Sequence, residues 1–458
     1  MPDANSAGLL RHVDRGLPAR IADSVQAKDG GVMSTAAFYD WLDDRRRDQL
    51  QTVDRIPFSA MRGWGFDPAT GDLRHHTGRF FSVQGLHVRT DFGPVGEWYQ
   101  PIINQPEIGI LGIAVREIDG LLHCLMQAKV EPGNINGVQL SPTVQATKSN
   151  YTRVHQGNAV PYLEHFRSTP PHRVLADVLQ SEQGSWFYGK RNRNMIIEVD
   201  SAEAGEDFCW LTIGQLHELL RVENLVNMDA RTVLSCMPDG TDMGRGSLTT
   251  NVEMLSWITA RQAEQDIRTE LVPLPDIKSW FRTETEIRHE LGVFFSVVGV
   301  DVTTNSREVS TWAQPLIEPH GVGIAALLIK RVDGVLHALV NARVEPGYRD
   351  VVEIAPTVQC TVENYAHLPA GSTPPFLEDV LSARPERVLF DTELSEEGGR
   401  FYHARSRYLI IEVDADFSGE DRPDYRWLTL PQLTALLQHS HYLNVQARTS
   451  VACLRGLL

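Results

Sequence analysis

Residues 127–133 read QAKVEPG, and residues 341–347 read NARVEPG. The two strings lie 214 positions apart, and each places a carboxylate before a Pro-Gly pair. Longer blocks share this spacing: FFSV and PTVQ recur at an offset of 214, and WLT and ART recur at 217. Small changes of offset between matching blocks are what surface loops absorb. We therefore predict a tandem duplication that covers nearly the whole chain.

The length of the repeated unit determines the kind of architecture. A period above 200 residues is far too long for a solenoid, so each copy is expected to form a domain with its own core. We place the first repeat at residues 1–240, with an N-terminal helical extension, and the second at residues 241–458. The boundary falls in MPDGTDMGRGS (237–247), which is rich in glycine and turn residues.

Composition excludes several classes of protein. The 458 residues carry a net charge of −16, which disfavours nucleic acid as a partner. No run approaches the 18 apolar residues of a membrane-spanning helix, and the N-terminus lacks the pattern of a signal peptide. The five cysteines form no CxxC pair, which argues against a zinc site or a disulfide framework. A cytoplasmic protein is predicted.

Local patterns predict mixed secondary structure. Residues 34–50 begin with a Ser-Thr cap and are expected to form a helix. Residues 211–222, with Thr212 as the N-cap, are expected to form another. Residues 108–131 contain two apolar runs around Asp119-Gly120, a hairpin signal, and residues 193–199 form another strand. Few strands are separated by helical crossovers, so the prediction is an α+β fold with a mainly antiparallel or mixed sheet.

Read as a strand, the opening motif has one polar face. Side chains two residues apart share a face, which puts His123, Gln127, Lys129 and Glu131 together. The second copy keeps the same pattern of histidine, amide, cation and carboxylate. Such a face is either solvated or part of a cleft. Because polar residues recur nearby in both copies, as Thr143 and Gln145 and as Thr357 and Gln359, we favour the lining of a cleft.

Segments that could meet an anion are more basic in the first copy. TKSNYTRVHQG (147–157) and FYGKRNRN (187–194) carry Lys148, Arg153, Lys190 and Arg193. A pyrophosphate favours such clusters, so the first pocket is predicted to bind the nucleotide sugar. The alternative is that these side chains pair with surface acids.

At this point the chain resembles the NDP-hexose 2,3-dehydratases of deoxysugar biosynthesis, over essentially its whole length. The resemblance is carried by HHTGRFFSVQG (75–85), EWYQP (97–101), KSNYTRVHQG (148–157), SEQGSWFYGKRNRNM (181–195), REVSTWAQPL (307–316), SEEGGRFY (395–402) and NVQART (444–449).

The resemblance implies a homodimer of duplicated Nudix-like mixed-sheet domains. It implies dTDP-4-keto-6-deoxyglucose as substrate and a 3,4-diketo-2,6-dideoxy sugar as product, with one catalytic pocket and one relic of the duplication. The labile product would pass to a downstream 3-ketoreductase. The metal-binding Nudix signature is absent from the sequence, which makes pyrophosphate hydrolysis an unfavoured activity. No dinucleotide fingerprint is present either, so no cofactor and no metal are predicted.

The reaction needs a base for the C3 proton, a donor at the C4 oxygen and an acid for the C2 hydroxyl. Glu131 is the candidate base, although an ion pair with Lys129 is an equal alternative. Tyr188 is preferred to His123 as the acid, because a strand of eight residues spans about 26 Å and separates His123 from Glu131. Lys129 or Gln145 could bind the C4 oxygen.

The remaining candidates are expected to bind substrate, with the tryptophans stacking on thymine unless they are core residues. For the first pocket they are Trp64, Trp98, Gln127, Thr143, Gln145, Lys148, Asn150, Tyr151, Arg153, Lys190 and Arg193. For the second pocket they are Arg343, Glu345, Thr357, Gln359, Arg400, Tyr402, Arg405 and Arg407.

Two other classes of function stay open. The chain could be a non-catalytic nucleotide-sugar binding protein or a partner subunit of a 3-ketoreductase, either of which would leave the 4-keto sugar intact. It could also be a Nudix-type hydrolase, which would release dTMP in a magnesium-dependent reaction.

Overall fold

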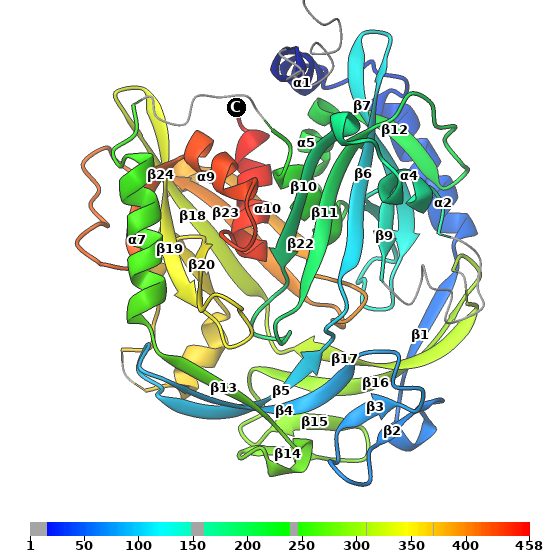
Figure 1. Cartoon of the computed structure of the whole chain (residues 1–458), viewed down its shortest axis with the longest axis vertical. Helices are drawn as coiled ribbons and strands as arrows, with labels where there is room; N and C mark the ends of the chain where they lie inside the picture. Colours follow the sequence, from blue (N-terminus) through cyan, green and yellow to red (C-terminus); the bar gives the residue numbers. More distant parts are fainter. Residues whose placement is uncertain (1–15, 148–159, 239–245, 308, 370) are drawn as a thin grey trace, which may run out of the picture.

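A computed structural model describes residues 16–147, 160–238, 246–307, 309–369 and 371–458. Four β-sheets and flanking helices form an α+β structure, which confirms the predicted fold class at that level. Figure 1 shows two seven-stranded sheets side by side, with α10 (Val445–Arg455) between them, and two five-stranded sheets below.

Each seven-stranded sheet belongs to one repeat and is mixed. Its central strands run in the order β10-β11-β6-β7-β12 in the first repeat and β22-β23-β18-β19-β24 in the second, and only the β11–β6 and β23–β18 pairs are parallel. The strands are β6 (Gly109–Ile118), β7 (Leu121–Val130), β8 (Val138–Ser141), β9 (Val144–Ala146), β10 (Val174–Ser181), β11 (Arg191–Glu198), β12 (Phe208–Thr212), β18 (Gly323–Val332), β19 (Val335–Val344), β20 (Val352–Ala355), β21 (Val358–Cys360), β22 (Val388–Ser395), β23 (Arg405–Glu412) and β24 (Tyr425–Thr429).

The five-stranded sheets are built from both repeats. Strand β1 of the first repeat pairs with β16 of the second, and β13 of the second pairs with β4 of the first. Their strands are β1 (Gln51–Ile56), β2 (Trp64–Phe66), β3 (Leu73–His75), β4 (Ser82–Thr90), β5 (Glu97–Asn104), β13 (Ile267–Val272), β14 (Trp280–Arg282), β15 (Glu286–His289), β16 (Phe295–Thr304) and β17 (Thr311–Pro319).

The local predictions are confirmed. Helix α2 (Thr35–Asp48) is capped by the Ser34 side chain, and α5 (Ile213–Leu219) has a Thr212–Gln215 capping box. The β6–β7 hairpin turns at Asp119 and Gly120, both with positive φ. The other helices are α1 (Leu17–Gln26), α4 (Leu163–Arg167), α6 (Met228–Ser235), α7 (Asn251–Glu264), α8 (Leu377–Leu381) and α9 (Leu430–Leu437), and 3-10 turns cover Phe58–Ala60, Pro171–Arg173, Leu274–Asp276, Val362–His367 and Pro385–Arg387.

Helices α6 and α10 join the repeats through two fully buried arginines. Arg231 on α6 donates from Nη2 to the carbonyl oxygen of Ser395 (2.6 Å) and from Nε to Thr449 Oγ1 (3.2 Å). Arg448 on α10 donates in the same way to the carbonyl oxygen of Ser181 (2.5 Å) in the first repeat. One hydrophobic cluster includes residues of both large sheets and both helices. Each repeat also has a hydrophobic cluster of its own beside this shared one. The copies therefore share strands and one core cluster in addition to their separate clusters.

Two further features bear on the class of protein. All five cysteines are free and buried. In the described part of the chain, every helix is too short or too polar to span a membrane.

Replacing Arg448 with alanine should lower the free energy of unfolding by about 3 kcal/mol or more, because buried carbonyl oxygens lose a charged donor. Urea denaturation measures this change. Arg384→Ala is the control, because the Arg384 side chain is 65% exposed and pairs only with exposed Glu386; its effect should stay within about 0.5 kcal/mol. Equal effects of the two changes would contradict a joining role for Arg448.

Candidate active site

A cavity of about 590 Å³ lies beside the first large sheet and is closed by residues of the second repeat. Its floor comes from the ends of β7 and β9 and the start of α6, and its aromatic side comes from β2 and the turn before β4. The second repeat completes the wall with Arg307, Val309, Thr311, Trp312, Ala313, Gln314, Glu397, Gly399 and Arg400. The polar groups that line it are Arg62, His75, Gln105, Lys129, Glu131, Gln145, Glu182, Lys190, Asn192, Asp229, Arg307, Gln314, Glu397 and Arg400.

Glu131 lies directly after β7, at the bottom of the cavity, and is 4% exposed. Gln145 donates from Nε2 to Glu131 Oε1 (2.9 Å). Lys129 Nζ and Arg307 Nη1 lie 3.9 and 3.7 Å from the same oxygen. One amide donor and two cations therefore compensate the charge of this carboxylate.

The glycine of the repeated VEPG string brings the second repeat to this site. The N–H of Gly133 donates to the carbonyl oxygen of Gly398 (2.7 Å), and the N–H of His403 donates to that of Gly133 (2.8 Å). A Cβ at Gly133 would lie 1.7 Å from the carbonyl oxygen of Phe401, so only glycine fits. The backbone of this loop is thereby held against the first cavity, and Glu397 comes with it.

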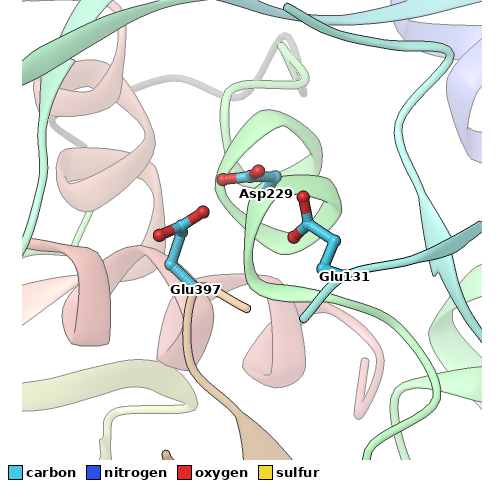
Figure 2. Close-up of side chains that lie close together, drawn as sticks. All are labelled: Glu131, Asp229 and Glu397. Atoms are coloured by element: carbon cyan, nitrogen blue, oxygen red, sulfur yellow. The ribbon is translucent and has the colours of Figure 1, made fainter. Parts of the chain in front are cut away.

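Figure 2 shows the carboxyl groups of Glu131, Asp229 and Glu397 turned toward one another. Their oxygens lie within 4.8 Å of one another. Asp229 is in the first turn of α6, behind the N-cap Asn227. Glu397 accepts the N–H of Gly399 at Oε1 (2.9 Å), while its Oε2 is buried without a hydrogen-bond partner. Three carboxyl groups so placed can hold a divalent cation or share protons.

Burial is the main influence on the protonation of this group. Burial raises the pKa of Glu397 to about 8, and the charge of Glu131 adds to the increase. Burial also raises the pKa of Asp229 well above its usual range, with Glu182, Glu397 and Glu131 contributing in that order. Neutral carboxyl groups are therefore available in this cavity near pH 7.

Cationic and aromatic side chains line the rest of the cavity. Burial lowers the pKa of Lys190 to about 8, against the opposing charge of Glu182. Arg400 donates from Nε to Gln105 Oε1 (3.0 Å), and its guanidinium lies 4.3 Å from the ring centre of Phe81. The tryptophans of the cavity are Trp64 from the first repeat and Trp312 from the second.

The structure brings five of the predicted first-pocket residues to the cavity: Trp64, Lys129, Glu131, Gln145 and Lys190. Four others, Lys148, Asn150, Tyr151 and Arg153, lie outside the described residues.

The remaining first-pocket candidates lie elsewhere. Tyr188 and Trp98 pack against Leu86, Val88 and Ile102 on the small sheet. Arg193 forms a bidentate pair with Asp177 (2.7 and 2.5 Å).

Thr143 holds the sheet together, accepting the N–H of Ala114 (2.9 Å) and donating to the carbonyl oxygen of Leu125. Gln127 is half-buried within β7, between β8 and β12, and does not line the cavity. His123 is buried and accepts the N–H of Val32 at Nε2 (3.2 Å), in agreement with a supporting role.

The second pocket is more filled. Arg343 donates from Nε to Glu345 Oε1 (2.8 Å), and Gln359 donates to the same oxygen (3.1 Å). Tyr348, where the first repeat has Asn134, is buried and accepts a hydrogen bond from Asn444 (3.1 Å). Arg343 and Tyr348 thus lie beside Glu345, where the first repeat has Lys129 and Asn134.

The other second-pocket candidates are distributed as follows. Arg400 lines the first cavity instead of the second, because its loop crosses to the first repeat. Thr357 repeats the sheet-joining role of Thr143, and Tyr402 packs on the small sheet. Arg405 pairs with Glu393, and Arg407 pairs with Asp391 (2.7 and 2.6 Å).

Sequence reasoning missed Asp229, Glu397, Arg307 and Trp312. For the two acids a signal existed in the aligned repeats. Asp229 aligns with Gln446 between the shared flanking residues of helices α6 and α10, and Glu397 aligns with Gln183. A comparison of unlike residues within the repeat, rather than of matching ones, would have found both.

Comparisons with known proteins agree with this architecture. A family model described as NDP-hexose 2,3-dehydratase matches twice, at residues 35–237 and 251–454. A protein of Saccharopolyspora spinosa is 51% identical over 96% of this chain and 95% of its own length. Relatives from Amycolatopsis orientalis and Streptomyces violaceoruber are 50% and 47% identical, over 95% and 93% of this chain and 93% and 98% of their own lengths. All three are named dTDP-4-dehydro-6-deoxy-alpha-D-glucopyranose 2,3-dehydratase.

This chain belongs to the NDP-hexose 2,3-dehydratase family, and it is an enzyme.

The raised pKa of Glu397 leads to a stability prediction. A carboxyl group with a folded pKa near 8 and an unfolded pKa near 4.5 binds more protons when folded, so its contribution to stability falls as pH rises from 4.5 to 8. Glu397→Gln should therefore raise Tm at pH 8.5, by at least about 2 °C, and change it less at pH 5. Differential scanning fluorimetry at both pH values tests this. Glu386→Gln, at an exposed acid, should leave Tm unchanged at either pH. A lower Tm for Glu397→Gln at pH 8.5 would contradict the prediction.

Proposed function

We propose that this enzyme removes the C2 hydroxyl of dTDP-4-keto-6-deoxyglucose and gives the 3,4-diketo-2,6-dideoxy sugar nucleotide. The observation that carries the proposal is near-full-length identity of 47–51% to three relatives named for this reaction. The cavity adds the required chemistry, because carboxyl groups, cations and aromatic rings line the same space.

The C4 carbonyl makes the C3 proton acidic, so elimination begins with a base at C3. Glu131 is the base in this proposal, because its negative charge is compensated by Gln145, Lys129 and Arg307. Lys129 and the Gln145 amide, at the same end of the cavity, are placed to stabilise the C4 oxyanion.

The nucleotide would occupy the rest of the cavity. Lys190 and Arg400 are two cavity cations away from Glu131 that can meet the pyrophosphate, with Lys148 and Arg153 proposed to join them. Trp64 and Trp312 offer rings for thymine, so Trp312 takes the place first proposed for Trp98.

Three finer features also belong to the proposal. Each large sheet is mixed and is followed by a helix, which supports a Nudix-like domain. A homodimer and transfer of the labile product to an NADPH-dependent 3-ketoreductase are proposed from the family. The second pocket, filled by Arg343 and Tyr348, is proposed to be the relic of the duplication.

Incubation with dTDP-4-keto-6-deoxyglucose, an NADPH-dependent 3-ketoreductase and NADPH should give a 2-deoxy sugar nucleotide. Glu131→Gln should reduce kcat by about 100-fold or more, because the base is lost. The matched change Glu345→Gln should cost far less. Product formation by mass spectrometry and NADPH oxidation report the result.

Intact substrate with the unchanged protein would favour a binding protein, and release of dTMP would favour a hydrolase. A larger loss from Glu345→Gln than from Glu131→Gln, with both variants folded, would move the reaction to the second pocket.

The pKa of Lys190 gives an independent test of the nucleotide site. Lys190 is charged below pH 8 and must gain a proton to bind pyrophosphate above it. Affinity for dTDP should therefore fall by up to about tenfold per pH unit above pH 8. Lys190→Gln should bind roughly 10- to 100-fold more weakly at pH 7 and lose this pH dependence.

Calorimetric titration between pH 7 and 9.5 measures both effects. Lys28→Gln, at a side chain that is 60% exposed, is the control. Unchanged affinity of Lys190→Gln would remove Lys190 from the nucleotide site.

A further inference from the structure

We infer that Asp229 is the acid of the elimination and that Glu397, supplied by the second repeat, is the neighbour that keeps a proton on it. The inference rests on the proposed function and assigns the step that Tyr188 cannot perform from the small sheet. Asp229 lines the same cavity as Glu131, and the two carboxyl groups lie within 4.8 Å of each other. That separation suits groups acting on the adjacent carbons C3 and C2.

The environment of Asp229 is that of a proton donor. Its residue is 4% exposed, and the influences that act most on its carboxyl group are burial and neighbouring charges, with no hydrogen bond among them. A buried carboxylate without donors is costly, whereas a neutral carboxyl group is not. Burial raises the pKa of Asp229 most, the charges of Glu182, Glu397 and Glu131 add to the increase, and the charge of Lys129 opposes it.

The three carboxyl groups divide into two kinds. Glu131 has the amide of Gln145 and the cations of Lys129 and Arg307 beside it. Asp229 lacks such donors, and the Oε2 atom of Glu397 is buried without a partner. Like charges within 4.8 Å cannot all ionise cheaply, so the proton stays on the Asp229–Glu397 side while Glu131 remains free to act as base.

A proton suits this group better than a divalent cation. Glu131 Oε1 already accepts an N–H from Gln145, and Lys129 and Arg307 would repel a metal ion next to it. A calcium or magnesium site needs six or more oxygen ligands, and the two cationic side chains supply none.

The other copy of the site shows what the acids add. Glu345 keeps the place of Glu131, but Gln446 stands for Asp229 and Gln183 stands for Glu397. Gln183 donates from Nε2 to Glu396 Oε2 (2.9 Å), which a carboxylate could not do. An amide can donate a hydrogen bond but cannot transfer a proton at neutral pH. The second pocket therefore keeps a carboxylate in the place of Glu131 but has amides in the places of Asp229 and Glu397.

The step balances without any other reactant. Glu131 takes the C3 proton, and the electron pair of that bond forms the C3–C4 enolate. The C2–O bond then breaks as the hydroxyl takes the Asp229 proton and leaves as water, which gives the C2–C3 enol. In the tautomerisation Glu131 returns its proton to C2, and Asp229 takes the proton of the C3 hydroxyl. Both side chains end in their starting states.

The decisive experiment separates proton abstraction from elimination. Asp229→Asn should lower kcat by about 100-fold or more while the variant still exchanges the C3 hydrogen of dTDP-4-keto-6-deoxyglucose with solvent, because Glu131 is intact. Proton NMR in D₂O follows the loss of the C3 signal, with Glu131→Gln as the variant that loses exchange. Gln446→Asn, the matched change in the second pocket, should leave turnover unchanged.

Glu397 is tested through the pH profile. Turnover needs protonated Asp229 and falls as pH rises through its pKa, which the negative charge of Glu397 helps to raise. Glu397→Gln removes that charge, so the alkaline limb of kcat should move to lower pH. A purely structural role would change kcat or Tm without moving the limb.

Three results would overturn the inference while leaving the overall function in place. These are an Asp229→Asn variant that turns over normally, one that loses C3 exchange together with turnover, and an alkaline limb that Glu397→Gln does not move. Loss of wild-type turnover in EDTA, with rescue by a divalent cation, would also overturn it, because the carboxyl groups would then hold a metal. Absence of turnover in the unchanged protein would instead reject the proposed function.

Discussion

The two repeats are held together by backbone contacts that only glycine permits. The N–H of Gly133 donates to the carbonyl oxygen of Gly398 (2.7 Å), and the N–H of Gly347 donates to that of Gly184 (2.8 Å). A Cβ at Gly133 would overlap the carbonyl oxygen of Phe401, and a Cβ at Gly347 would overlap that of Phe187. Because each loop then continues into the neighbouring cavity, the arrangement of both pockets depends on these contacts. The VEPG string occurs in both copies for a physical reason: its glycine must leave room for the backbone of the other repeat.

Although the two repeats support each other, their two pockets differ. The same exchange carries Glu397 into the first pocket and Gln183 into the second, so a change in one copy alters the site of the other. In the first pocket the carboxyl groups of Glu131, Asp229 and Glu397 lie together at a cavity, whereas in the second Arg343 donates to Glu345 and Tyr348 accepts from Asn444. A pocket in this protein is thus defined by both repeats, and neither half contains a complete one.

The sequence predicted the parts of the structure that depend on local chemistry. The hairpin at Asp119-Gly120, the Ser34 and Thr212 caps and the half-polar face of β7 all follow from short-range preferences, and all are present. The alternation along β7 also identified Lys129 and Glu131 as neighbours in a cavity. Single-strand patterns, however, cannot show which strand lies alongside. The pairing of β1 with β16 was therefore not predicted, and Arg400 was assigned to the pocket of its own repeat.

The same limit explains the errors at the site. Tyr188 and Trp98 were chosen by residue type, but both pack against the apolar residues Leu86, Val88 and Ile102 of the small sheet. Arg193 was chosen by charge, yet Asp177 on the adjacent strand satisfies it. Asp229 follows Glu131 by about 100 residues in the sequence, and Glu397 follows Asp229 by about 170 more. Their meeting is a property of the tertiary structure, and only the difference between the repeats hinted at it.

The exchange of β1 has a consequence for how the chain is made. Its partner β16 is Phe295–Thr304, so Gln51–Ile56 leaves the ribosome roughly 240 residues before the strand it must pair with. At ~5–20 residues per second, this edge stays unpaired for about 10–50 s. An open strand edge is a place where chains associate wrongly. The Asp54 and Arg55 side chains are charged and exposed in this short strand. They suit a segment that stays in contact with water until its partner strand has been synthesised.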